Sequence, residues 1–256
     1  MTILEKENRI APFIKEIILL ESDSHSQHNL PFYADGYPGI MYSETEKGVK
    51  LLPVNKILPK FFLYGQTIEP IELLIEGTYK LIVFQLYPFA TRLLLGIDPK
   101  DINDECYDLS QVKNIETTKI VSLIEPANTK KQVEIISNYV LKLVKNSSID
   151  SDNSIKLAVS TIINTKGTLP IKELRDQLFI TERTFERRFL KEIGVTPKQF
   201  AKIIQFSFSL NQIQESNYTK LTNVAYENGF ADQSHFIRTF KKYTGATPKE
   251  LLQKIV

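Results

Sequence analysis

Residues 185–200, FERRFLKEIGVTPKQF, return near the end of the chain as residues 236–251, FIRTFKKYTGATPKEL. The identical residues of the two copies stand 51 positions apart, beginning with Phe185 and Phe236. A repeat with this much internal detail indicates one supersecondary unit that is used twice. The structure of that unit therefore decides the fold of the last third of the chain.

Each copy predicts a helix with a defined start and stop. Thr181 and Asp232 precede the two copies, and both residue types are common helix N-caps. Gly194 and Gly245 stand where a helix ends in a left-handed residue. A Thr-Pro pair then opens a further helix, with Pro at its first position. The apolar stripes of the two helices are Phe185, Phe189 and Ile193 in the first copy and Phe236 and Phe240 in the second.

A shorter amphipathic helix is expected before each copy, at 171–178 and at 221–228. The connectors are tight, Phe179-Ile180 in the first copy and Gly229-Phe230-Ala231 in the second. Two helices joined by a tight turn, the second with a basic outer face, form the helix-turn-helix pattern. A DNA major groove admits such a helix, and an exposed Arg can bond guanine there.

An all-helical domain with solvated arginines is the alternative interpretation of one copy taken alone. Two copies that both carry an Arg at the same helical phase, Arg187 and Arg238, favour nucleic-acid binding.

The run GFADQSHFIRTFKKYTGATPKELL closely resembles the signature of AraC/XylS-type bacterial transcription regulators, and ITERTFERRFLKEIGVTPKQF resembles their first helix-turn-helix. The resemblance covers residues 155–256. It implies seven helices with two helix-turn-helix units, joined by a long central helix that would be 197–215 here. We therefore expect an α+β chain, with a β-rich N-terminal domain followed by an all-α domain of about seven helices.

The resemblance also implies which side chains read DNA. The base-reading positions of the family fall on Arg183, Glu186 and Arg187 in the first unit and on Gln233, Ser234, His235, Ile237 and Arg238 in the second. Thr184, Arg188 and Lys241 complete the predicted DNA-binding set on the same two helices. The first unit departs from the family twice, with Arg175 in place of a small residue and Phe179 in place of the turn glycine.

Charge is unevenly distributed along the 256 residues, a length that allows two domains. Residues 1–150 hold 16 Lys and Arg against 20 Asp and Glu, a net charge of −4. Residues 151–256 hold 16 against 10, a net charge of +6. The half that contains the repeat is thus the basic half, as binding to a polyanion requires.

The first half, residues 1–128, is expected to be a β-rich regulatory or sensory domain. Its runs IEPIELLIEG and YKLIVFQLYP are rich in β-branched and aromatic residues and have strand length. Together with PFYADGYPGIMY and FATRLLLGIDPKDI they resemble the N-terminal domain of one AraC-type subgroup. The resemblance implies a sensory or regulatory domain, names no ligand, and leaves open whether a small-molecule effector exists.

Few residues of the first half suggest chemistry, and no cofactor or metal is expected. His25 and His28 lack a third ligand nearby, so a polar loop is favoured over a metal site. Cys106, the single cysteine, has no evident His partner. The acidic run Asp98, Asp101, Asp104, Glu105 and Asp108 lacks the EF-hand spacing and favours a solvated loop or a helix N-terminus. Six tyrosines suggest either pocket lining or ordinary strand packing, namely Tyr33, Tyr37, Tyr42, Tyr64, Tyr79 and Tyr87.

The stretch 129–145, TKKQVEIISNYVLKLVK, predicts an amphipathic helix, and the polar residues 146–154 predict a linker. Two interpretations of the helix stay open. It either joins two chains in a homodimer or couples the domains, or it packs on its own β-domain.

These patterns predict a sequence-specific regulator that binds double-stranded DNA, with RNA polymerase as a further expected partner. The competing hypothesis is an enzyme or a small-molecule-binding protein whose helical domain is only a partner module. Some proteins with this helical domain also carry DNA-repair chemistry. That chemistry needs clustered reactive cysteines, and this chain has one. A reducing cytoplasm, at the bacterial nucleoid, is the expected location, since the sequence begins without a signal peptide and shows no apolar run of membrane-spanning length.

Overall fold

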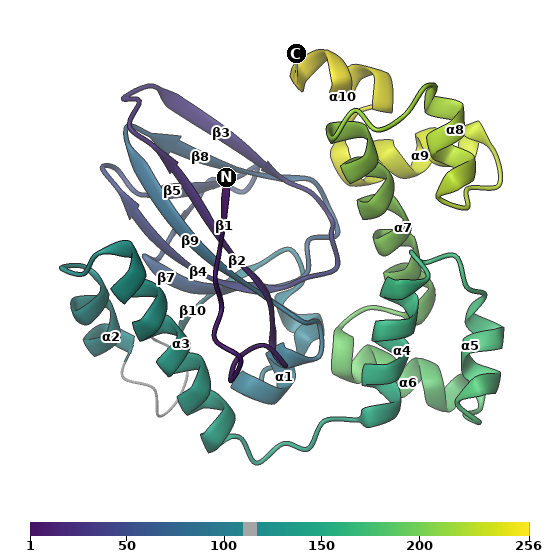
Figure 1. Ribbon diagram of the computed structural model, residues 1–256, viewed down its shortest axis with the longest axis horizontal. Coiled ribbons are helices and arrows are strands. Elements are labelled where there is room, and N and C mark those ends of the chain that lie inside the picture. The colour runs from purple at the N-terminus through teal and green to yellow at the C-terminus, as the bar shows by residue number, and fades with distance from the viewer. Residues whose placement is uncertain (110–116, 256) are drawn as a thin grey trace. The chain divides into compact units, whose positions relative to one another are not determined.

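The computed structural model describes residues 1–109 and 117–255 and separates into two compact units (Figure 1). The predicted domains 1–128 and 155–256 each include positions outside the described residues, 110–116 in the first and Val256 in the second. The first unit comprises 1–32, 37–65 and 71–151, and the second comprises 33–36, 66–70 and 152–256.

Two antiparallel sheets form the body of the first unit. The six-stranded sheet has the order β1-β2-β9-β4-β7-β10, and the four-stranded sheet has the order β3-β8-β5-β6. Their strands are β1 (Thr2–Leu4), β2 (Ile14–Ser22), β3 (Gln27–Phe32), β4 (Gly39–Thr45), β5 (Val49–Leu52), β6 (Lys56–Leu58), β7 (Phe61–Tyr64), β8 (Ile71–Glu76), β9 (Tyr79–Leu86) and β10 (Cys106–Asp108). The expected β-rich first half is confirmed.

One apolar cluster draws its members from both sheets. Met41, Phe62 and Val83 come from the larger sheet, and Leu51 and Ile75 come from the smaller one. The runs IEPIELLIEG and YKLIVFQLYP supply β8 and β9, which follow each other through a turn in which Gly77 has a φ of +85°. The cluster removes the apolar side chains of both sheets from water. This burial is the main stabilising contribution to such a fold.

Helix α3 (Thr129–Asn146) turns its apolar stripe toward its own β-unit. Ile136, Val140 and Leu143 are buried, and the Tyr139 ring meets the Phe61 ring of β7 at 5.4 Å. Of the two interpretations of this helix, packing on its own β-domain accounts for the stripe. The remaining helices of the unit are α1 (Ala90–Leu95), the 3₁₀ helix η1 (Pro99–Ile102) and α2 (Thr117–Ile124).

The second unit contains seven helices within the described residues, so the expected all-α domain is confirmed. They are α4 (Asn153–Asn164), α5 (Ile171–Gln177), α6 (Glu182–Ile193), α7 (Pro197–Gln214), α8 (Leu221–Glu227), α9 (Gln233–Thr244) and α10 (Pro248–Ile255). Figure 1 shows α7 running from the group α4–α6 to the group α8–α10. No helix among the described residues is both long and apolar enough to cross a membrane.

Candidate nucleic-acid interface

Helix α9 carries the second predicted reading face, opposite a fully buried aromatic face. Its inner side buries Phe236, Phe240 and Tyr243. Its N-terminus is capped by Asp232, whose carboxylate accepts a hydrogen bond from the backbone N–H of His235 at 2.7 Å. Gly245 ends the helix in the left-handed conformation. Of the predicted readers, Gln233, Ser234, Arg238 and Lys241 are exposed, whereas His235 and Ile237 are half-buried.

Helix α6 repeats this arrangement with a weaker start. Phe185, Phe189 and Ile193 are buried, and Gly194 ends the helix at a φ of +86°. Thr181 occupies the N-cap position, but its hydroxyl donates to the Thr184 hydroxyl at 3.0 Å instead of accepting from a backbone N–H. Of the predicted readers, Arg183, Glu186 and Arg187 are exposed, and Thr184 and Arg188 are half-buried.

Central helix α7 provides the support on which both reading helices pack. Phe200, near its start, contacts the Phe189 ring of α6 at 5.7 Å. Phe206, two turns later, contacts the rings of Phe240 and Tyr243 of α9, each at 5.0 Å. Large aromatic side chains that interlock in this way resist displacement. The two predicted reading helices are therefore fixed to one rigid element.

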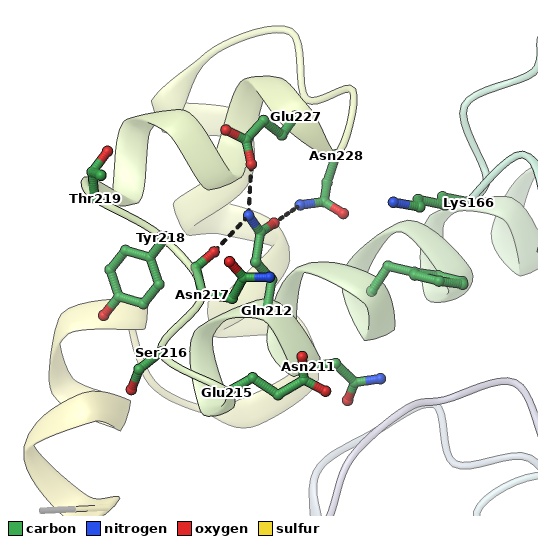
Figure 2. A pocket seen from close by; sticks show the side chains of 11 residues that line it. Lys166, Asn211, Gln212, Glu215, Ser216, Asn217, Tyr218, Thr219, Glu227 and Asn228 are labelled. Carbon is green, nitrogen blue, oxygen red and sulfur yellow. Dashed lines mark hydrogen bonds between the residues drawn. The ribbon is translucent and has the colours of Figure 1, made fainter.

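The turn of the second helix-turn-helix unit is held by a polar network. Buried Gln205 of α7 donates to the backbone carbonyl of Asn228 at 2.8 Å, and Asn228 donates to Gln212 of α7 at 2.7 Å. Gln212 in turn donates to the Glu227 carboxylate at 2.6 Å (Figure 2). An open polar hollow of about 730 Å³ lies beside these side chains.

Gly229, at the turn itself, satisfies two requirements at once. Its φ is +74°, and a Cβ atom there would lie 2.7 Å from Cγ2 of Thr168. A glycine tolerates both the left-handed backbone and the close approach. The turn of the second unit is therefore closely fitted to the loop that precedes α5.

The turn of the first unit differs at both positions that depart from the family. Phe179 stands where Gly229 stands in the second unit, with a φ of +53° and a side chain that is 97% exposed. Arg175 stands where the second unit buries Ala225 completely. The Arg175 guanidinium donates to Asp176 at 3.1 Å and to Glu182, at the start of α6, at 2.8 Å. Hydrogen bonding to Asp176 and then to Glu182 raises the pKa of Arg175.

Arg188 has a structural partner besides its predicted role. Its guanidinium contacts the Asp152 carboxylate at 2.5 Å, and Asp152 also caps α4 by accepting from the N–H groups of Ser154 and Ile155. Burial raises the pKa of Asp152, but the hydrogen bonds from Arg188 and the two N–H groups outweigh it and lower that pKa overall. The first reading helix is thus tied to the end of the linker, a contact that sequence spacing does not reveal.

The candidates of the first half occupy ordinary structural positions. His25 lies 3.0 Å from Glu46, and His28 bonds the Ser24 carbonyl at 3.1 Å. Asp98 caps η1 through the N–H of Lys100, as expected for an acidic residue at a helix N-terminus. Burial raises the pKa of Cys106 to about 12, which disfavours the thiolate. Of the six tyrosines, Tyr37, Tyr42 and Tyr64 are buried, and within the described residues no group of three or more metal-ligating side chains occurs.

Two family matches cover separate parts of the chain. Residues 174–254 match a family described as a helix-turn-helix domain. Residues 7–108 match a domain of unknown function, DUF6597. The first match includes α6 and α9, the two helices on which the predicted readers lie.

Curated relatives agree with the first of these matches. The HTH-type transcriptional activator RhaS of Escherichia fergusonii is 24% identical over 154 residues, which are 57% of this chain and 55% of that protein. RhaS of Pectobacterium atrosepticum is 30% identical over 78 residues, which are 30% of this chain and 28% of that protein. The alignments thus span about half or less of these relatives.

Solved structures of ToxT from Vibrio cholerae share the fold of both units. One at 1.65 Å resolution aligns with a TM-score of 0.51 and 16% identity over 93% of this chain and 97% of ToxT. Another, described as unsaturated fatty acid bound wild-type ToxT, gives the same TM-score over 92% and 94%. The repeated helix-turn-helix and its family match therefore agree with the resemblance to AraC/XylS-type regulators, and the ToxT structures share the fold.

Proposed function

We propose that this protein is a sequence-specific DNA-binding transcription regulator that reads two successive major grooves with α6 and α9. The observation that carries the proposal is the paired exposure of Arg187 and Arg238 at the same phase of two repeated helices. Both helices pack on α7 through buried aromatic rings. A rigid support of this kind suits contact with one face of a duplex at two points about one helical turn, ~34 Å, apart.

Charge supports duplex DNA as the partner. The chain from residue 151 onward has a net charge of +6. Cations that neutralise phosphates release counterions and supply most of the sequence-independent affinity. In this proposal Arg183, Arg187 and Arg238 contact guanines or phosphates, and Gln233 and Ser234 add hydrogen bonds to base edges. Glu186 accepts from a cytosine N4 or orients a neighbouring Arg.

The β-unit is proposed to modulate this activity by binding a small effector. The support is the fold shared with ToxT, which has been solved with an unsaturated fatty acid and with (E)-4-(8-methylnaphthalen-1-yl)but-3-enoic acid. Both ligands named there are apolar acids, so we propose that class as the first to test. The relatives named as transcriptional activators support activation. We propose RNA polymerase as the protein partner for that activity.

We also propose that two chains form a homodimer through the exposed side of α3. The stripe of Ile136, Val140 and Leu143 is buried within one chain, so a dimer would use the opposite, exposed side of the helix. That side carries Lys131 and Glu134, which pair at 2.8 Å, and Lys142. Such a contact is polar and is expected to weaken with salt.

The experiment is a selection of binding sites from random-sequence duplexes, followed by a salt series on the selected site. A regulator yields a defined site, and log affinity falls linearly with log salt. Recovery of no enriched sequence, with the chain folded, would reject the proposed function. Repeating the titration with a fatty acid then tests the effector.

A further inference from the structure

Among the described residues of the helical unit, Phe179 is the most exposed large apolar residue, and its backbone is strained. Its side chain is 97% exposed, and its φ of +53° lies in the left-handed region. Bulky residues avoid this region, at a cost of about 1–2 kcal/mol relative to glycine. No burial of the ring offsets that cost.

The second unit shows what the turn itself requires. Gly229 occupies the equivalent position, where a Cβ would meet Thr168 at 2.7 Å. At Phe179 there is room for a side chain, yet a large ring is present where Gly or Asn would relieve the backbone. Strain that packing does not repay is found at functional sites, where the side chain is needed for a contact.

The position of Phe179 relative to α6 indicates what the side chain contacts. It precedes Glu182, the first residue of α6, by three positions, so their Cα atoms are at most ~11 Å apart. In a docked helix-turn-helix, the N-terminal end of the second helix enters the major groove while the first helix crosses the backbone. The connecting turn therefore lies at the edge of the groove.

We propose that the Phe179 ring packs on apolar carbon atoms of the duplex at the edge of the first major groove. The inference rests on the proposed function and adds a specificity-determining residue to it. Two DNA groups offer such carbons, the C5 methyl of thymine and the deoxyribose ring. A thymine contact makes Phe179 select a base, whereas a deoxyribose contact makes it strengthen binding at any sequence.

The surroundings of Phe179 favour DNA over a protein partner. Asp176, Gln177 and Thr181, close to it in the chain, are exposed polar residues. A specific protein interface needs a core of adjoining apolar side chains and at least ~1,000 Å² of buried surface. Leu178 and Ile180, beside it in the chain, are half-buried, so Phe179 is the one fully exposed apolar side chain that the structure describes in this turn. One exposed ring matches the edge of a groove, where phosphates alternate with apolar carbons.

The test compares full-length Phe179→Gly and Phe179→Asn with the wild type on one selected site. Both variants remove the ring, and both residue types tolerate a left-handed backbone. We expect melting temperatures equal to or above that of the wild type, and binding weaker by about tenfold. Leu157→Ala, which removes an exposed apolar side chain from α4, is the control and should bind within about twofold.

Duplexes with uracil in place of thymine distinguish the two DNA groups. If the ring meets a thymine methyl, uracil in the part of the site that α6 contacts weakens wild-type binding by about fourfold and leaves Phe179→Gly unaffected. If uracil changes nothing while Phe179→Gly still binds weakly, the contact is with deoxyribose, which also supports the proposal. Folded glycine and asparagine variants that bind within about twofold of the wild type would overturn it. In that case the wild type still selects a site, so the proposed function stands; a wild type without sequence preference rejects both.

Discussion

The two helix-turn-helix units share a repeat of sequence but differ in how closely their turns are fitted. In the second unit Ala225 is buried, Gly229 meets Thr168, and Asp232 caps the reading helix. In the first unit Arg175 bridges two helices at the surface, Phe179 is exposed, and Thr181 makes no side-chain cap. The same aromatic packing on α7 supports both.

This difference shows that a reading helix can be positioned in two ways. The second unit relies on close packing and a buried polar network around Asn228. The first relies on partly exposed ion pairs, from Arg175 to Glu182 and from Arg188 to Asp152. Close packing tolerates few substitutions, whereas partly exposed ion pairs contribute less and respond to pH and salt.

The largest change in the free energy of unfolding should come from exchanging the residue types at positions 175 and 225. Ala225→Arg places a cation in a fully buried position and should destabilise the chain by more than ~3 kcal/mol. The reverse change, Arg175→Ala, removes pairs with two exposed carboxylates and should cost less than ~1 kcal/mol. Urea unfolding followed by helical circular dichroism measures both. Equal losses of stability in the two variants would contradict the closer packing of the second unit.

A substitution at the turn of the second unit should likewise destabilise the protein more than one at the turn of the first unit. Gly229→Ala adds a Cβ at a left-handed position 2.7 Å from Thr168 and should cost about 2–3 kcal/mol. Phe179→Ala keeps a backbone that is already strained and loses no packing, so it should cost less than ~0.5 kcal/mol. Thermal melting of the two variants beside the wild type checks this. A Gly229→Ala protein as stable as the wild type would remove the case for a closely fitted turn.

Substitution of Arg187 and of Arg238 should weaken DNA binding to different extents. Arg238→Ala should cost ~1–3 kcal/mol on the selected site and relax selectivity at one position. Arg187→Ala should lie at the lower end of that range, because exposed Glu182 and Glu186 on the same helix already oppose phosphate binding. Lys249→Ala, which removes an exposed cation from α10, controls for net charge. Losses below ~0.5 kcal/mol for both arginines, in folded proteins, would refute their assignment.

Removing the ion pair between Asp152 and Arg188 should lower the stability of the protein by a smaller amount, which depends on pH. Asp152→Asn keeps an N-cap residue but loses the charge that faces Arg188, and should cost about 1 kcal/mol at pH 7. The folded pKa of Asp152 is lowered, so its contribution is complete above the unfolded pKa of ~3.9 and is lost as pH falls through the folded pKa. Urea unfolding at pH 7 and pH 3, with Asp150→Asn in the linker as control, measures this. A difference that is unchanged at pH 3 would argue against the ion pair.

The sequence predicted features that local patterns determine. The ends of α6 and α9 follow from Gly194 and Gly245, and the stripes of the two helices follow from their phenylalanines. Contacts between residues far apart in sequence escaped prediction. Asp152 meets Arg188 from 36 residues away, a distance over which no local pattern links the two residues. Phe179 was noted as a departure, but only its exposure and left-handed backbone make it a candidate contact.

Footprinting of the full-length protein on its selected site tests the two-unit account most directly. The account predicts two protected blocks on one face of the duplex, about 10 bp apart. Arg187→Ala should weaken protection of one block and Arg238→Ala that of the other. A single protected block, or two blocks that fade equally in both variants, would contradict it.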